Sequence, residues 1–305
     1  MGMTIPHQKL VLGTVQLGMP YGINNTHGQP SNADALAILQ TAHAAGIRTL
    51  DTADAYGTAT AIIGEFHATC SEPFRIITKF HAADNVALAE KARETCSLLR
   101  VQRLACYQYH RFSDIQAFAA VQDDLQCLKE QGLVERVGAS VYTNEELQAA
   151  SAMPFVDVIQ LPFNLLDNHR LRGEFMREAK EQGKELHVRS VFLQGLLFKP
   201  LSEIPKGLQP LVPALERLHS IAKEYNLDMA ALALNYVLHH PLVDAVLVGV
   251  ERVEQLEQLL SSVLLPSDAL FLTLHDATTA IEAITLTEPH VLKLLNPVHW
   301  QHLKD

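Results

Sequence analysis

The stretch SNADALAILQTAHAAGIRTLD, residues 31–51, contains the repeating unit on which the fold depends. Ser31 is a good N-cap residue, and the apolar residues that follow it have helical spacing, so a helix is predicted over Asn32–Ala45. Gly46 ends this pattern, as a residue in the left-handed conformation does after a helix. The short run Arg48–Asp51 then predicts a strand. The stretch is therefore a helix, a turn and a strand of a parallel α/β fold.

The same unit recurs along the chain, with Gly132 and Gly183 in the place of Gly46, each just before another predicted strand. Eight strands are predicted, at Leu10–Leu17, Arg48–Asp51, Arg75–Lys79, Leu104–His110, Arg136–Ser140, Val156–Leu161, Glu185–Val191 and Asp244–Val248. Helical patterns lie between them, at Asn32–Ala45, Asn85–Leu99, Ser113–Glu130, Asn144–Ser151, Asn168–Gln182 and Pro210–Tyr225.

Eight strand–helix units without a Gly, Ser or Pro-rich linker predict a closed (β/α)8 TIM barrel, because an open sheet of this length would have two exposed edges. We expect residues 1–305 to form a single domain, with 263–305 as a C-terminal extension packed on the barrel. A doubly wound sheet would require a G-x-G-x-x-G motif after its first strand, and the sequence LGMPYGINNTHGQ at that place contains none.

The composition of the chain indicates which classes of binding partner it can have. A net charge of −10 argues against nucleic acid and anionic membrane surfaces as partners, since both attract basic proteins. The start MGMTIPHQKLVLG has no signal-peptide pattern and no run of about 18 apolar residues occurs, so a cytoplasmic protein is expected. Four widely spaced cysteines and 15 histidines form no metal-binding motif, and no metal is predicted. The expected partner is a small molecule.

Polar residues gather where the predicted strands end. The second strand runs into LDTADAYG, the third ends in ITKF, the fourth in CYQYHRF and the fifth in VGASVY. The carboxyl ends of the strands carry the active site in barrels of this kind. The candidates are Asp51, Tyr56, Lys79, His110 and Ser140.

These residue types indicate proton transfer at one oxygen atom. A lysine ammonium at Lys79 would lower the pKa of the Tyr56 hydroxyl, and the Asp51 carboxylate would keep that ammonium charged and in place. His110 would donate a hydrogen bond to a carbonyl oxygen and orient it. A G-x-S-x-G nucleophile motif is absent, which argues against acyl transfer.

The ordered motifs D-x-A-x-x-Y-G, T-K and Y-x-x-H on eight predicted strands resemble the aldo-keto reductase family. The resemblance extends from Leu10-x-x-Gly13-Thr14 to the loop at Gly249. It implies an NAD(P)(H)-dependent oxidoreductase that interconverts an aldehyde, ketone or sugar-derived carbonyl with an alcohol. Tyr56 would be the general acid and base, tuned by Lys79 and Asp51, with His110 orienting the carbonyl.

The resemblance also implies a nicotinamide cofactor that lies extended across the barrel top and transfers hydride directly to the carbonyl carbon. Ser140 and Gln160 would bind its carboxamide, and Gly249 would begin the loop and helix that hold the adenosine end. The full set of expected cofactor-binding residues is Gly13, Thr14, Asp51, Ser140, Gln160, Arg189, Ser190, Gly249, Glu251, Arg252 and Gln255.

Three positions depart from the family pattern. Val141 follows Ser140 where an asparagine is frequent, and Arg189 stands where an aromatic residue commonly stacks on the nicotinamide. Glu251 occupies a place where a basic residue often meets the adenosine 2′-phosphate, and a carboxylate there favours a ribose hydroxyl. Arg252 and Gln255 can still bind a phosphate. NADP(H) is therefore favoured, and NAD(H) remains open.

Two other functions stay open at this point. The three departures also fit a nucleotide-binding regulatory or interaction protein that keeps the barrel and turns over little. A barrel isomerase or lyase with a Schiff base on Lys79 is disfavoured, since Asp51 and Tyr56 favour a charged ammonium. The sequence specifies neither the substrate nor the oligomeric state.

Overall fold

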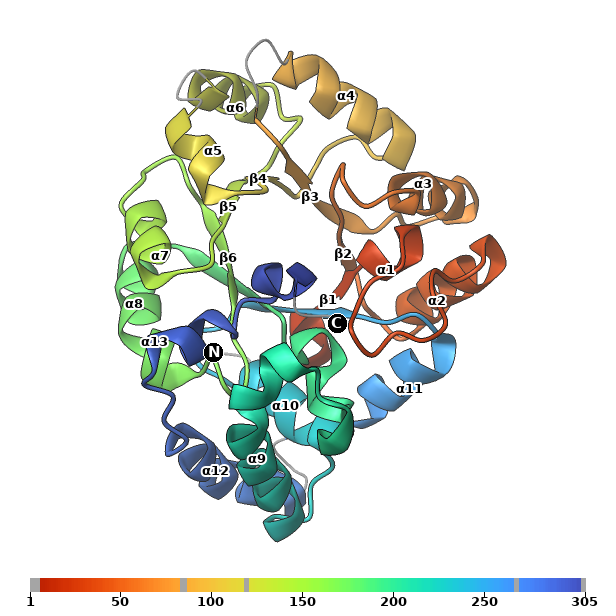
Figure 1. Ribbon diagram of the computed structural model, residues 1–305. Helices are drawn as coiled ribbons and strands as arrows, with labels where there is room; N and C mark the ends of the chain where they lie inside the picture. The colour runs from red at the N-terminus through yellow and green to blue at the C-terminus, as the bar shows by residue number, and fades with distance from the viewer. Residues whose placement is uncertain (1–5, 83–86, 118–120, 266–268, 303–305) are drawn as a thin grey trace.

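Eight parallel strands form a closed barrel in the order in which they occur along the chain, and β8 pairs with β1. The computed structural model describes residues 6–82, 87–117, 121–265 and 269–302. Figure 1 shows the strands at the centre with the helices around them. The strands are β1 (Leu10–Gly13), β2 (Thr49–Asp51), β3 (Arg75–Phe80), β4 (Cys106–Tyr109), β5 (Val137–Ser140), β6 (Val158–Pro162), β7 (Glu185–Arg189) and β8 (Ala245–Gly249).

The α-helices of the described residues are α1 (Val15–Gly18), α2 (Asn32–Ala44), α3 (Ala59–Thr69), α4 (Leu88–Leu99), α5 (Phe112–Ala117), α6 (Val121–Glu130), α7 (Asn144–Ser151), α8 (His169–Glu181), α9 (Val212–Glu224), α10 (Met229–Leu238), α11 (Val253–Ser261), α12 (Ala269–Glu282) and α13 (Pro289–Lys293). Short 3-10 helices are η1 (Pro6–Lys9), η2 (Leu193–Phe198), η3 (Leu201–Glu203), η4 (Lys206–Leu211) and η5 (Pro297–His302). The predicted barrel is thereby confirmed.

Local signals in the sequence explain several of these elements. The Ser31 side chain accepts a hydrogen bond from the Asp34 N–H at the start of α2, and Thr143 begins α7 in a full capping box. Gly46, Gly132 and Gly183 have φ values of 88°, 71° and 77°, which confirms the left-handed turn predicted at each.

Most predicted elements differ from the structure by one or two residues at an end, and the first strand differs by four. The first strand ends at Gly13 and not at Leu17, because both the N–H and the hydroxyl of Thr14 donate to the Asp51 carbonyl at 3.0 Å and the chain turns into α1. Of the helix predicted over Ser113–Glu130, the structure describes α5 and α6, and residues 118–120 between them lie outside the described part. The predicted start of another helix at Asn85 also lies outside it, and α4 is described from Leu88.

The barrel interior changes from apolar to polar along the strands. A separate small cluster of buried side chains is formed by Val11, Ile77, Cys106, Val158, Ala245 and Leu247. Side chains two residues apart on a strand share a face, so the next interior positions on β3, β4 and β6 are Lys79, Gln108 and Gln160. All three are buried. The packed apolar layer thus supports a polar layer at the carboxyl ends of the strands.

The C-terminal helices contact helices of the barrel. Helix α12 contacts α9 and α10, and Trp300 in η5 is buried with its Nε1–H donating to the Leu294 carbonyl at 2.8 Å. In Figure 1, η5 (dark blue) is drawn over the middle of the ring of strands. Across the described residues, none of the helices has the length and apolar character needed to span a membrane.

Candidate active site

An ion pair between Asp51 and Lys79 lies at the base of the barrel mouth, with 3% and 2% of each residue exposed. Lys79 Nζ donates to Asp51 Oδ1. The second carboxylate oxygen, Oδ2, accepts from Gln160 Nε2 at 2.9 Å and from Gln108 Nε2 at 3.4 Å. These bonds compensate a carboxylate that is removed from water. Gln108 was not predicted from the sequence, although its position between the outward-facing Tyr107 and Tyr109 on β4 is the signal that it points inward.

Tyr56 lies in the turn between β2 and α3, where the backbone packs closely against α1. A Cβ atom on Gly18 would lie 1.8 Å from the Tyr56 carbonyl oxygen, and one on Gly57 would lie 2.2 Å from the Gly18 carbonyl oxygen. Gly57 also has a φ of 52°, which favours glycine. The two glycines therefore set the position of the Tyr56 turn. Sequence reasoning missed Gly18, for which only the contact across the fold gives a reason.

The structure brings the four predicted catalytic residues together. Lys79 Nζ is 5.4 Å from the centre of the Tyr56 ring, and the rings of Tyr56 and His110 meet edge to face with their centres 6.0 Å apart. Asp51, at the end of β2, is the fourth residue of the group and forms the ion pair with Lys79. Tyr56, Lys79 and His110 are thus brought together at the carboxyl ends of the strands.

The electrostatics differ from the expectation in one respect. Burial raises the pKa of the Tyr56 hydroxyl, and the Asp51 carboxylate raises it further. The cation that opposes this rise is Arg189, whereas the prediction assigned that effect to Lys79. Burial lowers the pKa of Lys79, and Asp51 counteracts this by stabilising the ammonium. The phenol is therefore protonated at neutral pH, as a proton donor must be.

His110 is a neutral imidazole. Burial, with smaller contributions from Lys79 and His81, lowers its pKa to about 3. The His81 ring stacks on the His110 ring with centres 4.5 Å apart. The Nδ1 atom of His110 is buried and has no hydrogen-bond partner among the described residues. A neutral imidazole carries one N–H, so His110 can donate a hydrogen bond to an oxygen without bringing charge into the site.

The residues predicted to bind the carboxamide of a cofactor are adjacent. Ser140 on β5 is paired in register with Gln160 on β6, and both are buried. Gln160 Nε2 is engaged by Asp51, but its Oε1 is buried and has no partner among the described residues. Such an oxygen needs a donor, and an amide NH2 group is one. The arrangement therefore fits a nicotinamide carboxamide.

The residues predicted for the rest of the cofactor lie on β1, β8 and α11. Gly13 pairs in register with Gly249, and a Cβ on Gly249 would lie 2.4 Å from Gln16 Oε1, so this glycine leaves room for the Gln16 side chain. Thr14 is buried, with its hydroxyl donating to the Asp51 carbonyl. At the start of α11, the Gln255 side chain accepts from the Glu251 N–H at 2.9 Å and donates to the Glu251 carboxylate at 3.2 Å. Arg252 is exposed beside them.

At the end of β7, Arg189 and Ser190 face the end of β5. The Arg189 guanidinium carbon lies 4.2 Å from the centre of the Tyr142 ring, and Nη2 donates to the Val141 carbonyl at 3.1 Å. Ser190 has a φ of 61°, a strained value for a residue other than glycine. The pairing of Arg189 with Tyr142 was not foreseen from the sequence, because the two residues are far apart along the chain.

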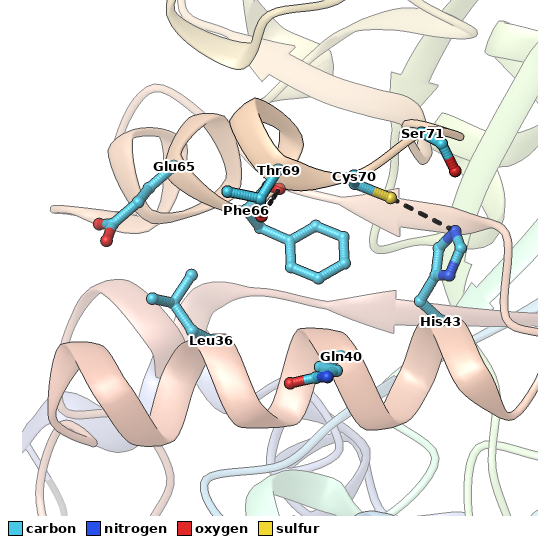
Figure 2. A pocket seen from close by; sticks show the side chains of 8 residues that line it. All are labelled: Leu36, Gln40, His43, Glu65, Phe66, Thr69, Cys70 and Ser71. Carbon is cyan, nitrogen blue, oxygen red and sulfur yellow. Dashed lines mark hydrogen bonds between the residues drawn. The ribbon is translucent and has the colours of Figure 1, made fainter.

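A groove lies between helices α2 and α3. This groove of about 480 Å³ is lined by Leu36, Gln40, His43, Glu65, Phe66, Thr69, Cys70 and Ser71 (Figure 2). Cys70 Sγ is 3.7 Å from His43 Nε2, and both atoms also contact the Glu72 carbonyl. It contains none of the predicted site residues.

The histidines form no metal site in the described part of the chain, where no group of three or more His, Cys, Asp or Glu side chains is placed to hold a metal ion. His240 instead bonds to His169, with 3.0 Å between its Nε2 and His169 Nδ1. His187 is buried and contacts Glu185. The rings of Tyr107 and Tyr109 pack on Phe80, with centres 4.5 and 4.8 Å from its ring centre, so both are packing residues.

The closed barrel with its polar layer at the carboxyl ends of the strands places the chain in the class of (β/α)8-barrel proteins. Within that class the chain is a member of the Aldo/keto reductase family, whose sequence profile matches residues 9–275. It is thus an oxidoreductase.

Individual relatives agree with this assignment. The chain is 34% identical over 101 residues to pyridoxal 4-dehydrogenase of Microbacterium luteolum, a match that covers 32% of this chain and only 29% of that protein. It is 22% identical over 286 residues to aldo-keto reductase YhdN of Bacillus subtilis, with 84% and 85% covered. The holo form of aldo-keto reductase AKR11C1 from Bacillus halodurans has a TM-score of 0.72 at 20% identity, with 93% of this chain and 95% of that chain covered.

Proposed function

We propose that this chain interconverts a carbonyl compound and an alcohol with a nicotinamide cofactor, with Tyr56 as the proton donor in the reducing direction. The observation that carries the proposal is the convergence of Tyr56, His110 and the Asp51–Lys79 pair in one barrel mouth. The substrate class is an aldehyde, a ketone or a sugar-derived carbonyl.

Each residue has a distinct part in the reaction. The bound nicotinamide supplies or accepts the hydride. As the carbonyl carbon is reduced, the Tyr56 hydroxyl gives its proton to the carbonyl oxygen, and the raised pKa ensures that this proton is present beforehand. Neutral His110 donates a hydrogen bond to the same oxygen. The Lys79 ammonium then stabilises the phenolate that remains, while Asp51 keeps that ammonium charged.

The cofactor would be held along the top of the barrel. Ser140 and Gln160 would bind the carboxamide, with the unpartnered Gln160 Oε1 accepting from its NH2 group. Gly13, Thr14, Asp51, Arg189 and Ser190 would surround the nicotinamide half. Gly249, Glu251, Arg252 and Gln255 would bind the adenosine half.

NADP(H) is the favoured form of the cofactor. Gln255 already binds the Glu251 carboxylate, whereas the Arg252 guanidinium is exposed next to it and available to a 2′-phosphate. NAD(H) would be favoured instead if Glu251 turned toward a ribose hydroxyl. Separate titrations with NADPH and NADH, followed by cofactor fluorescence, decide between these cofactors.

The variant Tyr56→Phe tests the mechanism, because it removes one hydroxyl from the site and leaves the ring. Turnover of a panel of aldehydes, ketones and sugars should fall by about 10²- to 10⁴-fold, the usual contribution of a positioned acid. The affinity for NADPH and the circular dichroism spectrum should stay at the wild-type values. Full activity in Tyr56→Phe would contradict the assignment. Tight cofactor binding by the wild-type chain without turnover of any carbonyl would favour a regulatory protein.

A further inference from the structure

Arg189 places a guanidinium inside the mouth of the barrel. It is the last residue of β7, two positions beyond the buried His187, and its register partner on β6 is Pro162. The side chain is half-buried and crosses to the end of β5, where it stacks on the Tyr142 ring at 4.2 Å and donates to the Val141 carbonyl at 3.1 Å. A half-buried guanidinium has lost part of its hydration, so it needs strong hydrogen-bond acceptors.

Its charge is not balanced by a carboxylate. Among the described residues Arg189 forms no ion pair, and its only other side-chain hydrogen bond is a long one of 3.4 Å to Ser190 Oγ. The charge of Arg172, by contrast, is balanced, because its guanidinium donates two hydrogen bonds to the Asp167 carboxylate, at 2.6 and 2.8 Å. A guanidinium has five N–H donors in a planar fork that matches carboxylate and phosphate oxygens. Arg189 therefore has donors left for an anionic group.

The position of this guanidinium is fixed from both sides. On the β5 side, the Tyr142 N–H donates to Glu146 Oε2 at 2.6 Å and its carbonyl accepts from Arg172 at 2.7 Å. On the β7 side, the Ser190 carbonyl accepts from Asn164 Nδ2 at 3.2 Å, which holds the strained turn that follows Arg189. Ordered partners reduce the entropy lost when a ligand binds.

The guanidinium also lies within electrostatic reach of the groups that would react. Its charge opposes the rise in the pKa of the Tyr56 and Tyr21 hydroxyls that burial causes. It adds a small contribution to the lowered pKa of His110 and Lys79, which is due mainly to burial. Unit charges interact strongly over a few ångströms in such a partly buried site. A small molecule with its carbonyl at Tyr56 and His110 would thus present its other end to Arg189.

We propose that Arg189, stacked on Tyr142, binds an anionic oxygen group of the substrate, so that the preferred substrates are acidic carbonyl compounds that bear a carboxylate or a phosphate. The proposal rests on the proposed function, because it specifies the substrate class of the same site. An anionic group could also belong to the cofactor, and the experiment separates the two sources.

The test compares two aldehydes of nearly equal size, 4-formylbenzoate and its neutral analogue 4-formylbenzamide. The ratio of their kcat/KM values is measured with NADPH for the wild-type chain and for Arg189→Gln. We expect the wild-type chain to prefer the acid and Arg189→Gln to lower the ratio by about 10- to 100-fold, as for the loss of a charge-assisted bidentate contact. Arg189→Lys keeps the charge without the planar fork and should give an intermediate ratio.

A control removes the same charge from the rim of the mouth. Arg111 follows His110 and is exposed, so Arg111→Gln should change the ratio by less than about twofold, as for a screened surface charge. An equal loss in Arg111→Gln would mean that a general surface field selects the acid, and it would overturn the proposal. A ratio in Arg189→Gln within about twofold of the wild-type ratio would do the same.

Binding measurements separate this proposal from the proposed function. Both aldehydes are titrated calorimetrically into the protein with NADP⁺ added, so a ratio of Kd values is obtained even if no carbonyl is turned over. Absence of turnover would then count against the proposed function, while loss of the Kd preference in Arg189→Gln would still support the anion site. An Arg189→Gln variant that binds NADPH at least tenfold more weakly and keeps the ratio would assign the anion to the cofactor and overturn the proposal.

Discussion

Replacement of Lys79 by methionine tests the central ion pair most directly. The change keeps the length and volume of the side chain but leaves the Asp51 carboxylate, only 3% exposed, without its cation. Oδ2 keeps its bonds to Gln160 and Gln108, whereas Oδ1 loses the one side-chain partner it has among the described residues. Removing one member of a buried pair costs about 3–5 kcal/mol.

A double-mutant cycle gives the size of the coupling. The variant with both Asp51→Asn and Lys79→Met removes both charges, so its unfolding free energy should exceed that of Lys79→Met by about 2 kcal/mol or more. The assay is urea unfolding at pH 7 followed by circular dichroism, with thermal unfolding beside it. A chain of this length has an unfolding entropy of about 0.6 kcal/mol/K, so Lys79→Met should lower Tm by about 5–8 °C.

An exposed pair provides the matched control. Arg75 lies 2.8 Å from Glu135, and 55% of its side chain is exposed, so Arg75→Met should cost less than about 1 kcal/mol. The reasoning is refuted if Lys79→Met costs no more than Arg75→Met, or if the double variant is destabilised by the full sum of the two single changes. Either result would mean that Asp51 and Lys79 are not coupled in the folded chain.

Two further predictions concern the Tyr56 turn and the response to acid. Gly18→Ala places a methyl group 1.8 Å from the Tyr56 carbonyl oxygen, so we expect it to lower the free energy of unfolding by about 1–3 kcal/mol, measured by thermal unfolding. It should also lower kcat more than it weakens NADPH binding. An unchanged kcat would contradict the role given to Gly18. Burial, with a smaller contribution from the neighbouring His169, lowers the pKa of His240 to about 4. Between pH 6.5 and 4, His240 therefore binds a proton in the unfolded chain but not in the folded chain. The free energy of unfolding should fall as the pH is lowered through this range. His240→Asn should flatten this fall in urea titrations, and an unchanged slope would assign it to other groups.

The sequence predicted the barrel because strand and helix patterns alternate eight times and the same glycine turn recurs at Gly46, Gly132 and Gly183. It also predicted that Asp51, Lys79 and His110 would converge, since parallel strands of a barrel bring their carboxyl ends to one mouth. Contacts between side chains across the barrel could not be predicted from the sequence in the same way. Whether Gln108 would reach Asp51 depends on the stagger of β4 against β2, which no local pattern specifies.

The same limit applies to the turn and to the electrostatics. Gly18 contacts Tyr56 across 38 positions of the chain, so its reason for being glycine is visible only in the fold. The direction of the Tyr56 pKa depends on burial and on the distances to Asp51 and Arg189, none of which follows from residue types. The NADP(H) preference, inferred from Glu251 and Arg252, stays a prediction.

The apolar layer below the polar mouth also determines how protons travel. Six apolar side chains pack in the interior beneath Lys79 and Asp51, and Lys79 is itself 2% exposed, so the barrel below the polar layer is filled with side chains. On the proposed function, a proton that Tyr56 gives up would return from solvent through the mouth of the barrel, where the substrate would also enter. Reprotonation of Tyr56 and release of the product would thus use the same opening, and a bound product would delay both.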